Sequence, residues 1–155
     1  MVDSVKKWGI NMLMGEFHHN LDEKGRITIP SKYRDELKEQ FIITRGIENC
    51  LYAYKKEDFE IIVKKLEQIP FTKKDARSFT RFFLSGATEV ECDKQGRINI
   101  SEPLISYANL KKECIIIGSG DRLEIWSKEG WEEFFNSTKD NMSSIAENIF
   151  NDIMM

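Results

Sequence analysis

Short runs of apolar residues alternate with turn-forming residues along most of the chain, in an order that occurs twice. Each unit reads as a strand, a tight turn, a return strand, a short helix, two further strands and a longer helix. The clearest strands are the pairs 41–44 with 51–54 and 114–117 with 123–126. Strands this short and this few cannot bury an apolar face alone, so the two units are predicted to build one shared core.

A sequence repeat underlies this order. The segment NLDEKGRITIP at residues 20–30 recurs as ECDKQGRINIS at residues 91–101, an offset of 71 residues. Five positions are identical in the two copies: Asp22, Gly25, Arg26, Ile27 and Ile29 match Asp93, Gly96, Arg97, Ile98 and Ile100. The expected organisation is an N-terminal extension at 1–13, a first repeat at 14–63, a basic helical connector at 64–86, a second repeat at 87–135 and a C-terminal helical tail at 136–155.

The connector and the tail both show helical spacing of apolar residues. In the connector, Phe79, Phe82 and Phe83 follow a break at Pro70, and their spacing favours core packing over the alternative of base stacking. In the tail, a capping box at 144–147 predicts the start of a helix with an apolar stripe, the kind that docks on a neighbouring surface. Residues 1–12 have a looser helical spacing.

Charge is unevenly distributed along the chain. The 23 basic and 26 acidic side chains give a net charge of −3, which lacks the basic excess typical of nucleic-acid-binding proteins. Residues 1–86 nevertheless carry 16 basic and 13 acidic side chains, whereas residues 87–155 carry 7 and 13. The basic peak lies at 64–81, where Glu67 and Asp75 face six cations: Lys64, Lys65, Lys73, Lys74, Arg77 and Arg81. A local positive surface is therefore compatible with the acidic total, the alternative being a solvated helix face.

The cysteines and histidines do not indicate a metal site or a cofactor. Cys50, Cys92 and Cys114 are widely spaced and form no C-x-x-C pair, so we expect reduced thiols. His18 and His19 are neighbours in a predicted strand and point to opposite faces, which argues against joint metal binding. No run approaches the roughly 18 apolar residues of a membrane helix, so we expect a cytoplasmic protein with no membrane partner.

The repeated D-x-x-G-R segment is the strongest candidate for chemistry. In 22–25 and again in 93–96 the residue types suit a type I turn, with Asp accepting backbone N–H bonds and Gly taking positive φ. The next residue, Arg26 or Arg97, begins the return strand. An arginine fixed on a rigid turn can present its planar fork to phosphate oxygens or to guanine O6 and N7. An internal ion pair with the turn aspartate fits the same geometry and stays open as the alternative.

The motif LDEKGRITIP resembles the N-terminal motif of the MraZ family, which is related to the AbrB and SpoVT DNA-binding domains. The second copy CDKQGRINI, the preceding RFFLSGA and the LEIW strand with its Trp-containing helix are also similar to that family, over residues 14–135. The resemblance implies a mixed α+β fold in which two tandem AbrB-like βαβ units form a pseudo-symmetric, swapped-hairpin β-barrel flanked by helices.

The resemblance further implies a bacterial transcription regulator that is cytoplasmic and associated with the nucleoid. It would bind repeated sites on double-stranded DNA upstream of the division and cell-wall gene cluster, and it would form homo-oligomeric rings of about eight subunits. We expect repression as the outcome, and the sequence leaves activation open. On this sequence it assigns DNA contact to Arg26 and Arg97, with Asp22, Gly25, Asp93 and Gly96 organising the loops. Lys24 and Lys94 are added as DNA contacts, and Arg77, Arg81, Lys73 and Lys74 as secondary candidates for phosphate or subunit contact.

Two other functions remain open at this point. An AbrB-like interaction module of the antitoxin kind would use the same fold without direct promoter binding, although a tandem motif forms its pseudo-dimer within one chain. An enzyme is least supported, because no nucleophile, base and orienting residue recur at a recognised spacing. Gly118-Ser119-Gly120 also lacks the third glycine of a dinucleotide-binding loop. We therefore expect neither catalysis nor a small-molecule substrate.

Overall fold

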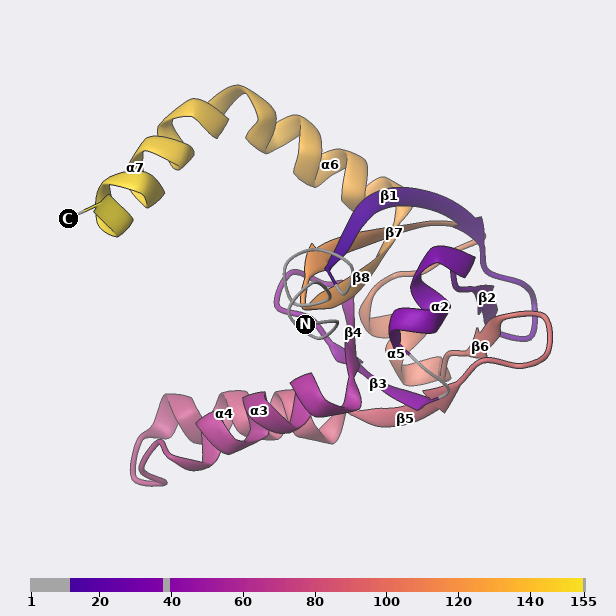
Figure 1. Cartoon of the computed structure of the whole chain (residues 1–155), viewed down its shortest axis with the longest axis horizontal. Helices are drawn as coiled ribbons and strands as arrows, with labels where there is room; N and C mark the ends of the chain where they lie inside the picture. Colours follow the sequence, from indigo (N-terminus) through magenta and orange to yellow (C-terminus); the bar gives the residue numbers. More distant parts are fainter. Residues whose placement is uncertain (1–11, 38–39, 155) are drawn as a thin grey trace, which may run out of the picture.

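The computed structural model describes residues 12–37 and 40–154 (Figure 1). In chain order its elements are β1 (Leu13–Asn20), β2 (Arg26–Thr28), α2 (Ser31–Leu37), β3 (Gln40–Arg45), β4 (Leu51–Lys55), α3 (Lys56–Glu67), α4 (Lys74–Ser85), β5 (Thr88–Glu91), β6 (Arg97–Asn99), α5 (Glu102–Tyr107), β7 (Glu113–Gly120), β8 (Arg122–Ser127), α6 (Lys128–Thr138), the 3₁₀ helix η2 (Lys139–Asn141) and α7 (Met142–Met154). The looser helical spacing expected for residues 1–12 lies, apart from Met12, outside the described residues.

Six antiparallel strands form the main sheet, in the order β1-β7-β8-β4-β3-β5. Exchanging the two repeats replaces β1 by β5, β3 by β7 and β4 by β8, and the same order is then read backwards. The first strand of each repeat pairs with the other repeat, β1 with β7 and β5 with β3. The predicted repeat is therefore a structural pseudo-twofold, and neither half has a complete sheet without the other.

The short return strands β2 and β6 pair only with each other, as a separate two-stranded ribbon. Ile27 lies opposite Ile98 at its centre, and both side chains are buried. Each end of the ribbon is tied to the turn of the other repeat: Ile29 N donates to Gly96 O at 2.9 Å, and Ile100 N donates to Gly25 O at 2.8 Å. The two D-x-x-G-R turns are thus held against the same ribbon.

The mixed α+β class is confirmed, but the expected closed barrel is not formed by the described strands. The main sheet is open, with β1 and β5 at its edges. Strands are exchanged between the repeats, yet the strand after each turn pairs with its counterpart rather than with the strand before the turn. Only three residues long, β2 and β6 supply too few ladder bonds to close the sheet, and their mutual pairing places both isoleucines over one core.

Two apolar cores lie on the two faces of the main sheet. One is covered by the β2–β6 ribbon with α2 and α5, and the other by α3, α4 and α6. Strand β4 shows the alternation most clearly, because Leu51 and Ala53 enter the first core while Tyr52 and Tyr54 enter the second. The central strands are therefore buried on both faces.

The phenylalanines of the connector pack as predicted. Phe83 is buried and its ring stacks on Phe59 of α3 at a centroid distance of 5.7 Å, while Phe79 stacks on Phe83 at 5.3 Å. Phe82 meets the ring of Tyr107 edge-on. Helices α3 and α4 form an antiparallel pair that projects from the sheet (Figure 1).

The C-terminal helix begins earlier than its capping box predicts. Helix α7 starts at Met142 rather than at Ser144, because η2 continues helical backbone from the end of α6. Figure 1 shows α6, η2 and α7 (orange to yellow) as an arm that leaves the sheet in a different direction from the α3–α4 pair. Its predicted apolar stripe exists and is exposed to solvent.

Candidate nucleic-acid interface

The first D-x-x-G-R turn is built around the carboxylate of Asp22. Its Oδ1 accepts the backbone N–H of Lys24 at 3.0 Å and that of Arg26 at 2.8 Å. The turn closes through Gly25 N, which donates to Asp22 O at 3.0 Å. Gly25 has φ +79°, and a Cβ there would lie 3.0 Å from Ile100 O. The predicted roles of aspartate as backbone acceptor and of glycine at positive φ are confirmed.

The second turn repeats these bonds almost atom for atom. Asp93 Oδ1 accepts from Gln95 N and Arg97 N, both at 2.9 Å, and Gly96 N donates to Asp93 O at 2.9 Å. Gly96 has φ +80°. Left-handed backbone costs residues other than glycine roughly 1–2 kcal/mol. Glycine avoids this cost, so Gly25 and Gly96 allow the turn shape that precedes each arginine.

Each turn aspartate also holds the guanidinium that follows it. Arg26 Nε donates to Asp22 Oδ2 at 2.7 Å, and Arg97 Nε donates to Asp93 Oδ2 at 2.9 Å. The internal ion pair left open by the sequence is therefore present in both copies. In both copies the aspartate contacts Nε of the arginine. These side chains remain 30% and 27% exposed.

The electrostatics of the turns favour the charged carboxylates. The hydrogen bond from the backbone N–H of Arg26 is the main cause that lowers the pKa of Asp22 below 3.8, with the Arg26 side chain and Lys24 N–H adding to it. Arg97 lowers the pKa of Asp93 in the same way. Both carboxylates therefore stay ionised at neutral pH and keep their arginines oriented.

Both arginines lie on the same side of the ribbon. Ile27 and Ile98 point into the core, so their neighbours along the strands point away from it. Arg26 pairs with Asn99 and Arg97 with Thr28, which makes the two arginines diagonal neighbours with Cα atoms about 7–8 Å apart. Figure 1 shows both turns at one end of the molecule, away from the helical arms.

Lys24 and Lys94 add two exposed cations to this end. They occupy different positions of the two turns, since Lys24 is equivalent to Gln95 and Lys94 to Glu23. Each turn therefore carries one tip lysine and one oriented arginine. We call this set of four side chains, with their two turns, the turn surface.

Arg34 of α2 is a site residue that the sequence did not reveal. Its Nε donates to Ile29 O at 3.0 Å, and its guanidinium covers Gly96, where a Cβ would lie 2.4 Å from Arg34 Cζ. The equivalent residue of the second repeat is Ile105, which contacts Gly25 in the same way. The second turn thus has a neighbouring guanidinium that the first lacks. The repeat offset aligns these two residues, but only the crossed pairing of β2 and β6 shows which turn each one touches.

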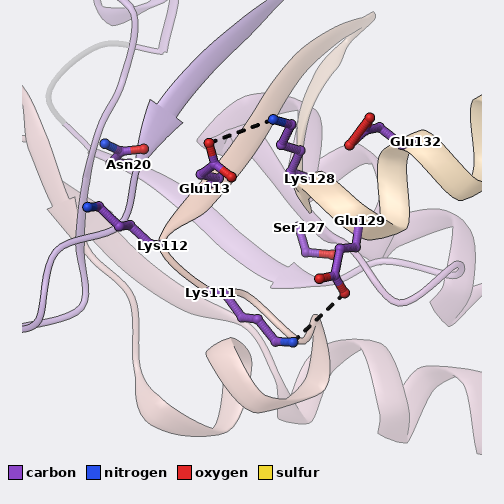
Figure 2. Close-up of a pocket in the computed structure, with 8 residues that line it drawn as sticks. All are labelled: Asn20, Lys111, Lys112, Glu113, Ser127, Lys128, Glu129 and Glu132. Atoms are coloured by element: carbon purple, nitrogen blue, oxygen red, sulfur yellow. Dashed lines mark ion pairs between the residues drawn. The ribbon is translucent and has the colours of Figure 1, made fainter.

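A hollow beside the first turn contains three lysines (Figure 2). Its lining residues are Asn20, Lys111, Lys112, Glu113, Ser127, Lys128, Glu129 and Glu132. Lys111 reaches Glu129 at 3.8 Å and Lys128 reaches Glu113 at 3.7 Å, so two of the lysines are balanced internally. Lys112 points toward Asn20, and its backbone O accepts from Leu21 N next to the turn. It is the lysine of the hollow best placed to extend the turn surface.

The secondary candidates lie elsewhere. Lys73, Lys74, Arg77 and Arg81 belong to the α3–α4 pair, at a distance from the turns (Figure 1). Arg77 Nη1 donates to Phe71 O at 2.7 Å and so braces the tip between the two helices. The structure does not bring these four side chains together with Arg26 and Arg97.

Other chemistry has little support in the described residues. His18 bonds Glu16 at 3.0 Å, and no group of three or more His, Cys, Asp or Glu residues within 12–37 and 40–154 is arranged to hold a metal. Gly118, Ser119 and Gly120 are the last residues of β7 rather than a loop. Across the described part of the chain, none of the helices has both the length and the apolar character needed to span a membrane.

Comparison with protein families gives two matches in tandem. The family model described as "MraZ protein, putative antitoxin-like" matches residues 12–82 and again residues 83–153. The two matches are offset by 71 residues, as are the two turns, and together they span nearly the whole chain. This is a regulator-type family rather than a family of enzymes. With two oriented Asp–Arg turns on one ribbon and a family match over both repeats, the chain belongs to the MraZ family.

Proposed function

We propose that this protein is a sequence-specific transcription regulator that grips double-stranded DNA through its turn surface. The observation that supports this most directly is the orientation of Arg26 and Arg97. Each is fixed through Nε by an aspartate of its own turn, and each side chain stays partly exposed on the outward side of the ribbon. The internal ion pair then orients the guanidinium for a DNA contact and does not prevent that contact.

The exposed part of each guanidinium suits two acceptors side by side. Guanine O6 and N7 offer such a pair in the major groove, and phosphate oxygens offer another. A bidentate arginine–guanine contact contributes about 1–3 kcal/mol of discrimination. Lys24 and Lys94 would neutralise phosphates on either side, while Arg34 would hold the second turn in position.

Modest affinity per chain fits an assembly that engages repeated sites. A chain with net charge −3 has little general attraction for DNA, so we propose that a homo-oligomeric ring of about eight subunits presents many turns at once. The second contact is then effectively intramolecular. The expected targets are promoter repeats of the division and cell-wall cluster, with repression as the outcome and the nucleoid as the location.

The first test is a gel shift with the promoter of the protein's own operon over a salt series. Wild type should shift the promoter in preference to a scrambled duplex. Arg26→Ala and Arg97→Ala should each weaken binding about tenfold or more, because each removes one oriented guanidinium. Light scattering on the same samples should show an unchanged assembly. Unchanged affinity in both variants would contradict the proposal.

A second candidate is an antitoxin-like interaction module, and the description of the matching family favours keeping it. Such a module would hold one protein partner in fixed stoichiometry. A pull-down that recovers that partner, combined with no preference for promoter over scrambled DNA, would support this function instead. The oriented arginines favour DNA, because nothing in the antitoxin function requires two oriented, partly exposed guanidinium groups on one ribbon.

A further inference from the structure

The two strands of the β2–β6 ribbon differ from each other on the outward side only. The first copy reads RITI at residues 26–29, and the second reads RINI at residues 97–100. All four isoleucines are buried under the ribbon. Thr28 and Asn99 alternate with them, so they point outward with the arginines. The core side of the ribbon is therefore the same in both copies, and the outward side is not.

Asn99 lies beside the first turn, although it belongs to the second repeat. It is the direct partner of Arg26 in the ribbon, and opposite residues of antiparallel strands have Cβ atoms about 4.5–5.5 Å apart. Its Oδ1 lies 3.4 Å from the position that a Cβ on Gly25 would take. The Asn99 side chain is exposed. An exposed amide is thus placed next to the guanidinium that Asp22 orients.

The other end of the ribbon has different chemistry. Thr28 is opposite Arg97 and is half-buried. The turn at Gly96 is covered by the guanidinium of Arg34 and not by an amide. One arginine therefore has an amide as its neighbour, and the other has a hydroxyl group and a second guanidinium. The pseudo-twofold symmetry of the ribbon is broken on the side that faces outward.

Strand formation does not account for an asparagine at this position. Threonine is enriched in β-strands and asparagine is depleted, and the exposed amide of Asn99 adds nothing to the core. In the major groove, however, a carboxamide has a defined partner, because it can donate to N7 of adenine and accept from N6. Arginine has the same relation to O6 and N7 of guanine, whereas threonine is compatible with several bases.

The dimensions of the ribbon match those of the major groove. The groove is about 12 Å wide and admits a two-stranded β-ribbon. Neighbouring bases of one DNA strand are about 3.4 Å apart, which is close to the Cβ separation of roughly 5 Å between opposite residues of the ribbon. Arg26 and Asn99 can therefore reach two adjacent base pairs together.

We propose that Asn99 is a specificity-determining residue that reads an adenine next to the guanine contacted by Arg26. Its Nδ2 donates to adenine N7, and its Oδ1 accepts from adenine N6. The inference rests on the proposed function, because it requires the outward face of the ribbon to enter the major groove. It adds that the two ends of the ribbon select different bases, since the Arg97 end has Thr28 in the equivalent place and no amide.

The first experiment selects binding sites from a duplex library randomised over several helical turns. Wild type should enrich a site in which an adenine adjoins a guanine. Asn99→Ala should enrich the same guanine with the adenine preference reduced at least about fivefold, and Asn99→Gln, which keeps the amide, should retain that preference. As a matched control, Asn141→Ala removes an exposed amide from η2 and should enrich the wild-type site.

The outcomes of this selection separate the inference from the proposed function. If wild type enriches no sequence, sequence-specific DNA binding fails and the role of Asn99 fails with it. If wild type and Asn99→Ala enrich one site with equal preferences at every base, DNA recognition stands and the role of Asn99 is refuted.

The second experiment changes the DNA instead of the protein. 7-Deazaadenine pairs normally with thymine but lacks N7, so a selected duplex that contains it loses one acceptor at the adenine. Fluorescence anisotropy should show that wild type and Thr28→Ala bind this duplex at least about threefold more weakly than the unmodified one, whereas Asn99→Ala binds both alike. Equal losses for wild type and Asn99→Ala, or no loss for wild type, would overturn the proposed contact.

Discussion

The arginine of each turn has two possible roles, contact with nucleic acid or an internal ion pair with the turn aspartate. In the structure the ion pair is formed, and it is compatible with the first role. The ion pair exists in both copies, and Nε of each arginine donates its hydrogen bond. An exposed ion pair of this kind contributes little to folding stability. What it supplies is a fixed direction for the remaining nitrogens, which lowers the ordering cost of any contact they make.

The turn carboxylates should titrate at unusually low pH. Backbone N–H bonds and the neighbouring arginine lower the pKa of Asp22 and of Asp93 below 3.8. Their stabilising bonds are then fully present above pH 3.8 and are lost as the pH falls through the lowered values. Carboxyl NMR titration measures both midpoints. A midpoint at or above 3.8 for either residue would contradict the turn geometry.

The three thiols should react in an order set by burial. Burial raises the pKa of Cys50 to about 12 and that of Cys114 to about 11, whereas Cys92 is only half-buried. With iodoacetamide at pH 8, mass spectrometry should find Cys92 alkylated first, since the thiolate is the reactive form. Earlier modification of Cys50 or Cys114 in the folded protein would show that the sheet faces are more open than described.

At the scale of elements, the sequence predicts the strands and helices well and their partners poorly. Alternation and helical spacing locate β3, β4, β7, β8 and the helices α3 and α4. The pairing partner of β2 could not be predicted. A three-residue strand carries no pattern that distinguishes a neighbour in its own repeat from one about 70 residues away. The swapped-hairpin barrel that the resemblance implies is therefore not confirmed by the described strands, and the contact of Arg34 with Gly96 could not be predicted from the sequence.

The ribbon should therefore be a core element and not a surface turn. Ile98 is 1% exposed at its centre, whereas Ile47 in the loop between β3 and β4 is 67% exposed. Ile98→Ala should lower the free energy of unfolding by about 2–5 kcal/mol, and Ile47→Ala by no more than about 0.5 kcal/mol. Urea denaturation followed by circular dichroism gives both values. Equal effects would mean that β2 and β6 do not seal the core.

At the scale of the whole molecule, separation of surfaces explains how an acidic chain can bind DNA. The turn surface occupies one end, and the acidic α6–α7 arm leaves from elsewhere (Figure 1). The net charge sums the turn surface and the acidic arm. It therefore limits non-specific affinity for DNA but does not determine the strength of a contact made by two oriented arginines. The sequence alone could locate the turns and the acidic tail, because both are local. Their placement at opposite parts of the fold depends on strand pairing across the repeats.

The most direct test of the central claim compares two doubly substituted proteins by fluorescence anisotropy on the promoter duplex. Arg26→Ala/Arg97→Ala and Lys32→Ala/Lys111→Ala remove the same charge, the second pair from exposed positions in α2 and in the segment before β7. The arginine variant should bind at least about thirtyfold more weakly and show a shallower salt dependence, while the lysine variant stays within about threefold of wild type. Equal losses would reduce the interaction to net charge, and no loss in the arginine variant would contradict DNA recognition by the turns.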